Sequence, residues 1–106
     1  MNKTEKTVLD KFKALLVKRD ILDRLILFGS RARGEASPYS DMDVVVIIAN
    51  SSKEEDFDYV SDSAWAAGFE HGIVIVPVVF TKAEWENGPE RYSLLAQAVK
   101  ADGVQI

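Results

Sequence analysis

The sequence has no cysteine among its 106 residues, a single histidine and no long hydrophobic run. Without cysteine the chain has no disulfide, no thiol nucleophile and no zinc–thiolate site, and this composition fits a reducing compartment. The first residues, Met1 to Lys6, are polar and lack the apolar stretch of a signal peptide. No segment approaches the roughly 20 apolar residues that cross a bilayer. We therefore expect a cytoplasmic protein that makes no contact with a membrane.

Basic residues are in the minority, 13 against 17 acidic ones, and the formal net charge at pH 7 is −4. Broad nucleic-acid binding requires a basic surface, so this balance disfavours DNA and RNA as partners. A local basic patch from Arg31 and Arg33 stays open, but a free nucleotide with its metal ion suits the chain better. With 47% hydrophobic and 28% charged residues, we expect a single folded domain over residues 1–106.

Hydrophobic periodicity predicts helices that alternate with the strands of a small sheet. Pro77 interrupts the third predicted strand, which places that part at a sheet edge or a strand end. The predicted strands cover residues 23–28, 42–49 and 73–80. Capping boxes predict the start of three helices: Asn2–Glu5 for the first helix, Ser52–Glu55 for a helix that ends at Gly68, and Thr81–Glu84 for a short helix through Glu86. A short helix over 30–36 has Ser30 as N-cap, and a last helix over about 90–101, with Tyr92, Leu95, Ala98 and Val99 on its inner face, precedes a packed tail.

Two short motifs lie on either side of the first connection between predicted strands. The first, FGSRARG at residues 28–34, is typical of a strand that runs into a glycine-flanked turn, where N–H groups and a hydroxyl can bind phosphate. The second, SDMD at residues 40–43, places Asp41 and Asp43 at positions i and i+2, hence on one face of a strand. Paired carboxylates hold Mg²⁺, which takes hard oxygen ligands and retains waters and substrate phosphates. Together the motifs indicate nucleotide chemistry.

The two glycines of the first motif have the G-x-x-x-x-G spacing of a P-loop, but the residues that follow exclude one. A P-loop continues with lysine and then serine or threonine. Here Glu35 and Ala36 follow Gly34. The lysine that grips phosphate is absent, so we reject a P-loop ATPase.

Gly29-Ser30, the Arg-x-Arg-Gly stretch and the Asp41-x-Asp43 pair resemble, in their order and spacing, the signature of the DNA polymerase beta-like nucleotidyltransferase superfamily. The phrase GSRARGEASPYSDMDVVVI is similar to its smallest branch, the minimal nucleotidyltransferases. The resemblance is sharp from about Leu25 to Ile48 and extends over the rest of the chain by the order of its elements. It implies an α+β nucleotidyltransferase fold, in which a small mixed β-sheet of three or more strands packs with helices.

The resemblance implies Mg²⁺-dependent transfer of a nucleoside monophosphate from ATP or another NTP to an acceptor hydroxyl. Asp41 and Asp43 would be the catalytic ligands of one or two Mg²⁺ ions, and Gly29, Ser30 and Arg33 would bind the phosphates of the nucleotide. Each residue also has an ordinary structural interpretation. The aspartates can be a turn residue and a solvent-facing side chain, the glycine a simple turn, the serine a helix cap and the arginine a surface charge.

Members of the resembled branch are often paired with a HEPN-domain protein, in many cases a toxin RNase, which implies that this chain has such a partner and acts as its antitoxin. One departure bears on activity: the third predicted strand, 73–80, has no acid where many active members carry a third carboxylate. Val74 or a near neighbour fills that position, with Glu70 or His71 as a possible substitute. The alternative is a catalytically degenerate binding module that neutralises a partner protein by contact. The sequence leaves the nucleotide, the acceptor and the oligomeric state open.

Overall fold

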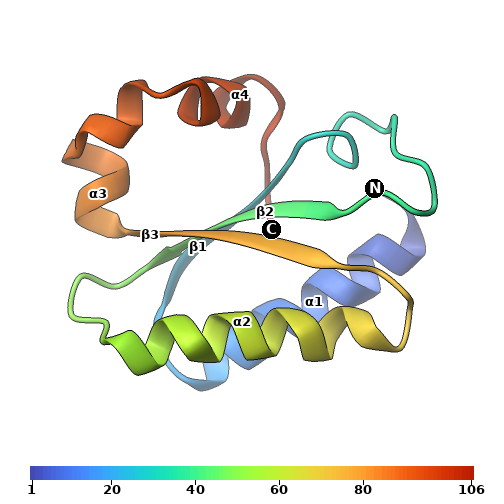
Figure 1. The fold of residues 1–106 in the computed structure, drawn as a ribbon, viewed down its shortest axis with the longest axis horizontal. Coiled ribbons are helices and arrows are strands. Elements are labelled where there is room, and N and C mark those ends of the chain that lie inside the picture. Colours follow the sequence, from blue (N-terminus) through green and yellow to red (C-terminus); the bar gives the residue numbers. More distant parts are fainter.

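A four-stranded mixed β-sheet forms the middle layer of the molecule, with strand order β3-β2-β1-β4 (Figure 1). The strands are β1 (Leu22–Phe28), β2 (Met42–Ile48), β3 (Ile75–Thr81) and the short C-terminal β4 (Val104–Gln105). Strand β1 lies antiparallel to both β2 and β4, whereas β3 lies parallel to β2 and forms an outer edge. The computed structural model describes the backbone of residues 1–106 and every side chain except that of Glu90.

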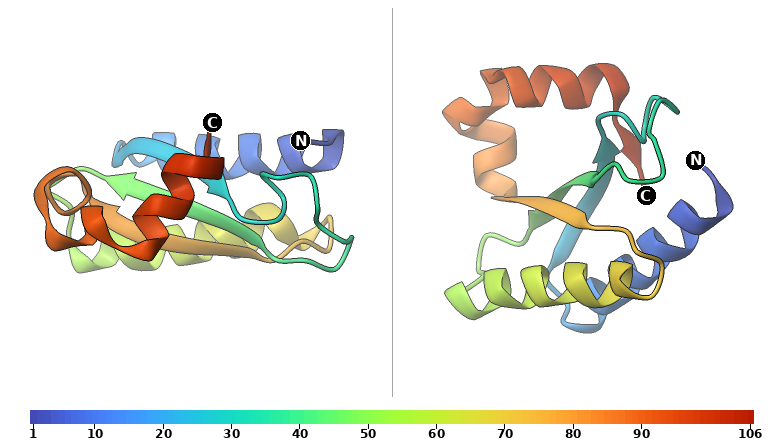
Figure 2. Two further views of the ribbon diagram at one scale, coloured as in Figure 1. Left: turned by 90° about the horizontal axis from the view of Figure 1, so that it is seen from above. Right: turned by 45° about the vertical axis from the view of Figure 1, so that its right-hand side comes forward.

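Helices cover both faces of this sheet, as Figures 1 and 2 show. They are α1 (Lys3–Lys18), α2 (Glu54–Phe69), α3 (Lys82–Asn87), the 3₁₀ helix η1 (Pro89–Tyr92) and α4 (Leu94–Asp102). The two long helices α1 and α2 pack side by side on one face, and the shorter helices lie on the other. Successive residues of a strand point to opposite faces, so Val44 and Val46 of β2 face α1 and α2, whereas Val45 and Ile47 face the shorter helices.

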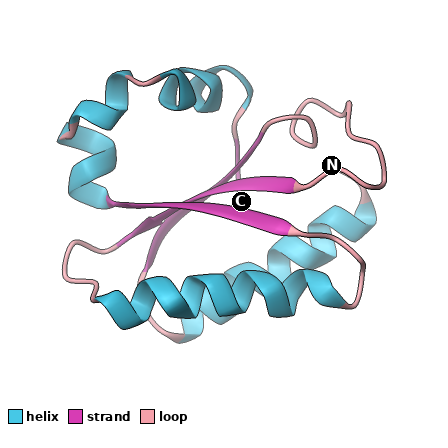
Figure 3. Cartoon of the chain, in the orientation of Figure 1, coloured by secondary structure: helices cyan, strands magenta, loops and turns pink.

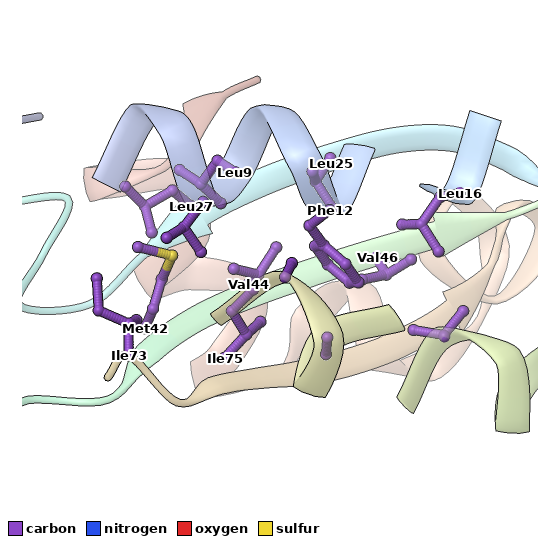
Figure 4. Close-up of a cluster of buried hydrophobic side chains, with 14 of the residues drawn as sticks. Leu9, Phe12, Leu16, Leu25, Leu27, Met42, Val44, Val46, Ile73 and Ile75 are labelled. Atoms are coloured by element: carbon purple, nitrogen blue, oxygen red, sulfur yellow. The ribbon is translucent and has the colours of Figure 1, made fainter. Parts of the chain in front are cut away.

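The larger hydrophobic core lies between the sheet and the two long helices (Figure 4). Strand β2 is central and buried on both faces, which explains its continuous apolar sequence from Val44 to Ile48. Figure 3 shows the same three layers by secondary structure, with the strands sandwiched between helices. Among the described residues, no helix is long and apolar enough to cross a membrane. The largest fully buried side chains of this core include Leu9, Phe12, Leu16, Leu25, Leu27 and Met42.

Several local predictions are confirmed. The sheet is mixed and packed with helices, as the α+β prediction requires. Asn2 caps α1, and its side chain and that of Glu5 form the expected reciprocal hydrogen bonds, both 2.8 Å long. Thr81 caps α3 in the same way. Pro77 lies on the edge strand β3, where a missing N–H group is tolerated.

The predicted short helix over 30–36 is wrong. Residues 30–34 form a hydrogen-bonded turn in which the N–H group of Arg33 donates to Gly29, as in one turn of helix. The turn stops there because Gly34 takes a left-handed conformation (φ +73°) and the next N–H group, of Glu35, reaches back to the carbonyl of Ser30.

Two further helix boundaries differ from the prediction. Helix α2 is capped by Lys53, not by a Ser52–Glu55 box, because Asp56 accepts the N–H group of Lys53 and is held there by an ion pair with Arg19.

The last predicted helix is two elements, because Ser93 caps a new helix through the N–H group of Ala96. Because the helix begins again at Leu94, its buried residues differ from those predicted. Ala96 and Val99 are buried, Leu95 is half-buried, and Tyr92 and Ala98 are exposed.

Candidate active site

The two sequence motifs meet at one end of the sheet, where β1 ends and β2 begins. Phe28, the last residue of β1, pairs with Asp43 of β2, so Gly29 lies beside this carboxylate. A Cβ atom added to Gly29 would lie 2.8 Å from Oδ2 of Asp43. A side chain at this position would therefore meet the carboxylate, and glycine leaves the space that the turn needs. This contact brings together the two motifs that the sequence predicts to act as one site.

The carboxylates of Asp41 and Asp43 lie close enough to interact. Asp43 is half-buried on the sheet face that bears α3 and α4, and Asp41 is exposed just before β2. Burial raises the pKa of Asp43 above its ordinary value, and the neighbouring charge of Asp41 raises this pKa further. The pair is thus a site of unrelieved negative charge, which a cation would stabilise.

The turn after β1 presents free backbone donors. Gly29 has a left-handed backbone (φ +76°), which turns the chain sharply at the end of the strand. Within the part of the chain that the structure describes, the N–H groups of Ser30, Arg31 and Ala32 meet no hydrogen-bond acceptor. Such a set of adjacent N–H groups at the start of a helical turn suits an anion, in keeping with the predicted roles of Gly29 and Ser30.

Arg33 lies on the same turn but is already paired. Its Nε donates to Glu35 at 3.0 Å, and its Nη1 lies 3.5 Å from a carboxylate oxygen of Asp102 at the end of α4. The hydrogen bond to Glu35 raises the pKa of Arg33, which therefore stays cationic. The side chain is exposed. To bind a phosphate, as predicted, it would have to give up both of these carboxylate partners.

Arg31, a surface charge in the sequence prediction, is buried and structural. Its guanidinium donates to the carbonyl of Ser40 from both Nε (3.1 Å) and Nη2 (2.6 Å). Its Nη1 donates to Glu5 at 3.0 Å. This network ties the turn after β1, the loop before Asp41 and the N-terminus of α1 to one another. No local sequence signal reveals it, because Glu5 lies 26 residues from Arg31 and also completes the helix cap.

The carboxylate of Glu5 is held ionised by this network. Burial by itself raises the pKa of Glu5, but the N–H group of Asn2 and the guanidinium of Arg31 outweigh it, and the pKa is lowered overall. A buried charge with two hydrogen-bonded partners is stable where an unpaired one would not be.

The comparisons with known proteins agree with this geometry. A family model of the nucleotidyltransferase domain matches residues 5–98, which include both motifs and most of the sheet. The chain belongs to the nucleotidyltransferase domain family. The recognition of this family from the sequence is therefore confirmed.

Two curated relatives of this nucleotidyltransferase domain come from Methanocaldococcus jannaschii. "Putative protein adenylyltransferase MJ0141" is 32% identical over 66 residues, which cover 62% of this chain and 67% of that protein. "Putative protein adenylyltransferase MJ0604" is 36% identical over 76 residues, which cover 71% of each chain.

Two solved structures share the fold. One is a toxin-antitoxin crystallised with AMP-PNP (TM-score 0.58, 21% identity, covering 89% of this chain and 68% of that chain). The other is a mutant of the toxin-antitoxin MntA-HpeT in which two aspartates are replaced by glutamate (TM-score 0.55, 18% identity, covering 99% and 72%). At these identities the likeness shows the fold.

Valine residues of β3 lie beside the aspartate pair of this nucleotidyltransferase domain. The parallel register places Val76 of β3 directly beside Asp43, and the carbonyl of Val74 accepts the N–H group of Met42 between the two aspartates. Among the described residues no three His, Cys, Asp or Glu side chains gather as a metal site. Neither Glu70 nor His71, the substitutes considered from the sequence, completes the pair.

Replacing Glu5 by Gln should destabilise the nucleotidyltransferase domain in a pH-dependent way. Loss of one partner from a buried pair costs about 3–5 kcal/mol. The folded pKa of Glu5 is depressed, so its contribution is complete above the ordinary value of 4.5 and is lost as the pH falls through the lower folded pKa. Urea unfolding between pH 7 and pH 3 should therefore show a gap between wild type and Glu5→Gln that narrows toward the acid end.

The matched control is Asp10→Asn on the same helix, since Asp10 forms an exposed ion pair with Lys6. That change should shift the free energy of unfolding by no more than about 1 kcal/mol. A Glu5→Gln gap of the same size at every pH would contradict the ionised, paired state of Glu5.

Proposed function

We propose that the chain transfers a nucleoside monophosphate from ATP, or another NTP, to a hydroxyl group of a partner protein, with Asp41 and Asp43 as ligands of Mg²⁺. The observation that carries this proposal is the close approach of the Gly29 turn to Asp43. A binding scaffold has no physical need for two repelling carboxylates beside a turn of free N–H groups. A nucleotide with its cation needs both.

The residues present fit a divalent cation that keeps part of its coordination shell. Asp41 and Asp43 supply hard oxygen donors from one side, and Mg²⁺ commonly takes one or two carboxylates and completes its shell with phosphate oxygens and waters. The raised pKa of Asp43, caused by burial and by Asp41, supports a cation as the partner of this pair. When bound, Mg²⁺ neutralises the charge that develops on the α-phosphate and the departing pyrophosphate.

The chain's own residues supply position and donors. The N–H groups after Gly29 and the hydroxyl of Ser30 bind phosphate oxygens, which holds the α-phosphorus near Asp43. The acceptor oxygen forms a bond to the α-phosphorus while the bond from that atom to the pyrophosphate oxygen breaks. The proton of the acceptor hydroxyl passes to water, since the site is open and Asp41 is exposed. Arg33 adds a cation once phosphate displaces Glu35 and Asp102.

The partner in this proposal is a HEPN-domain toxin, with the chain as its antitoxin. The names of the two M. jannaschii relatives support a protein as acceptor and ATP as donor. The toxin-antitoxin structures that share the fold support a partner protein and, through AMP-PNP, an adenine nucleotide. Helices and strands make up most of the described chain, and the proposal takes the acceptor hydroxyl from another molecule.

One observation favours a second candidate function, a degenerate module that neutralises its partner by contact. Val76 occupies the place beside Asp43 where a third carboxylate would help deprotonate the acceptor. Contact alone would then give the biological effect, and the aspartates would be dispensable for it.

Incubation with ATP labelled at the α-phosphate, Mg²⁺ and host-cell lysate should transfer label to a protein. Asp41→Asn and Asp43→Asn should each reduce this transfer by about a hundredfold or more, because each removes charge stabilisation made in the transition state. Asp10→Asn, exposed on α1, is the control and should retain full transfer. Two results together would contradict the transferase and favour the contact module. The folded chain would transfer no label, and the double Asn variant would still neutralise the toxin in cells.

Removal of divalent cations should reverse the order of stability of wild type and Asp43→Asn. Without cations the Asn variant should melt at the higher temperature, because it lacks a half-buried carboxylate whose pKa is raised by burial and by Asp41. Mg²⁺ with ATP should raise the melting temperature of the wild type. At a ligand concentration of a hundred times Kd, the free energy of unfolding should increase by about 2.7 kcal/mol. The same addition should leave the variant nearly unchanged. If scanning calorimetry showed the same shift in melting temperature for wild type and Asp43→Asn, Asp43 would not be a ligand of the cation.

A further inference from the structure

Helix α2 and the edge strand β3 enclose an exposed apolar groove away from the larger core. The groove has a volume of about 470 Å³ and is lined by Ser61, Trp65, Phe69, Val74 and Pro77, among others. Trp65, Phe69 and Val74 are 65%, 67% and 52% exposed, respectively. Large apolar side chains gathered on one surface, rather than scattered, mark a binding face. The two elements that form it lie side by side in Figure 1.

The aromatic side chains of the groove, Trp65 and Phe69, belong to a row that follows the helical repeat and begins outside the groove at Phe57. Phe57, Ser61, Trp65 and Phe69 are each four residues apart on α2, so they form one row along the helix. The rings of Trp65 and Phe69 contact each other, with centroids 5.7 Å apart. This row offers an elongated apolar surface rather than a single small-molecule pocket.

Negative charge borders the groove. Asp58 and Asp62 are exposed and stand three residues before Ser61 and Trp65, which puts their carboxylates next to the aromatic row. From residue 54 to residue 81 the sequence has six carboxylates and neither lysine nor arginine. Among the described side chains, only Asp56 of the α2 acids forms an ion pair. The apolar groove therefore lies in a region whose charged side chains are acidic.

The outer edge of β3 is unsuited to an added strand. Val74 directs its carbonyl to β2, so Ile75, Pro77 and Val79 direct their backbone groups outward. Pro77 has no N–H group and interrupts that outer row of donors. An occupant of this face therefore binds through side chains, as a helix does when it lies in a groove.

We infer that this groove binds a basic amphipathic segment of a partner protein, with apolar side chains against Trp65 and Phe69 and lysine or arginine side chains against Asp58 and Asp62. A second copy of this chain is a poor occupant, because a two-fold contact would place the same acidic border against itself. Val74 lines the groove, and its carbonyl accepts the N–H group of Met42, the residue between the two site aspartates. Binding does not depend on the proposed transferase activity.

Fluorescence anisotropy with labelled synthetic helical peptides of about 18 residues tests the inference on the full chain. The probe is a Leu/Lys peptide with an apolar and a basic face. The controls are a scrambled peptide of the same composition and a Leu/Glu peptide with the same pattern. We expect saturable binding of the first peptide, at least about tenfold tighter than the other two, and weaker in high salt.

Four variants distinguish peptide binding in the groove from non-specific binding elsewhere on the surface. Trp65→Ala and Phe69→Ala should each weaken binding about tenfold. Asp58→Lys combined with Asp62→Lys should reverse the preference toward the Leu/Glu peptide. Tyr92→Ala is the matched control, an aromatic side chain 70% exposed in the opposite helical layer, and should leave binding unchanged. These side chains are exposed, so the variants should fold, as circular dichroism would verify.

Three results would overturn the inference. The first is equal binding of all three peptides, or of none. The second is binding of the basic peptide that Trp65→Ala and Phe69→Ala do not weaken. The third is a dimer in sedimentation experiments that Trp65→Ala dissociates, which would assign the groove to a second copy. None of these results depends on transfer of label from ATP.

Discussion

The buried guanidinium of Arg31 is the interaction on which the geometry of the site depends. It joins the turn after β1 to the carbonyl of Ser40 and to Glu5 at the start of α1. The turn and the loop are the two segments that must meet for Gly29 to lie beside Asp43. The central sheet fixes where β1 ends and where β2 begins, and Arg31 fixes the connection between them. A charged residue in the motif is thus used to build the site, while Arg33 on the same turn is exposed and paired with Glu35 and Asp102.

Two carboxylates of the fold, Glu5 and Asp43, lie in opposite electrostatic surroundings. Glu5 is buried with partners on both oxygens, and its pKa is lowered. Asp43 is half-buried against another carboxylate, and its pKa is raised by burial and by Asp41. The first charge is satisfied within the chain, whereas the second has the negative charge of Asp41 as its neighbour. The same helix α2 has a packed apolar face and, on another side, the exposed aromatic side chains Trp65 and Phe69.

Much of the fold could be predicted because its signals are local. The capping boxes at Asn2 and Thr81 act over three residues, and the buried strand from Val44 to Ile48 is visible in composition alone. The site motifs could be predicted for the same reason, since Asp41 and Asp43 are two residues apart. The rest depends on distant contacts. Arg19 sets the start of α2 through Asp56, and the pair of Arg31 with Glu5 spans 26 residues. The parallel register that places Val76 beside Asp43 is likewise a property of the sheet.

The central claim is that the Gly29 turn and the two aspartates form one nucleotide site. A crystal structure with Mn²⁺ and a non-hydrolysable ATP analogue tests it most directly, because Mn²⁺ replaces Mg²⁺ at oxygen ligands and is located by its anomalous signal. We predict Mn²⁺ in contact with carboxylate oxygens of both Asp41 and Asp43, with phosphate oxygens on the N–H groups after Gly29 and Arg31 still bound to Ser40. An anomalous peak away from the two aspartates, or a nucleotide bound elsewhere on the chain, would contradict it.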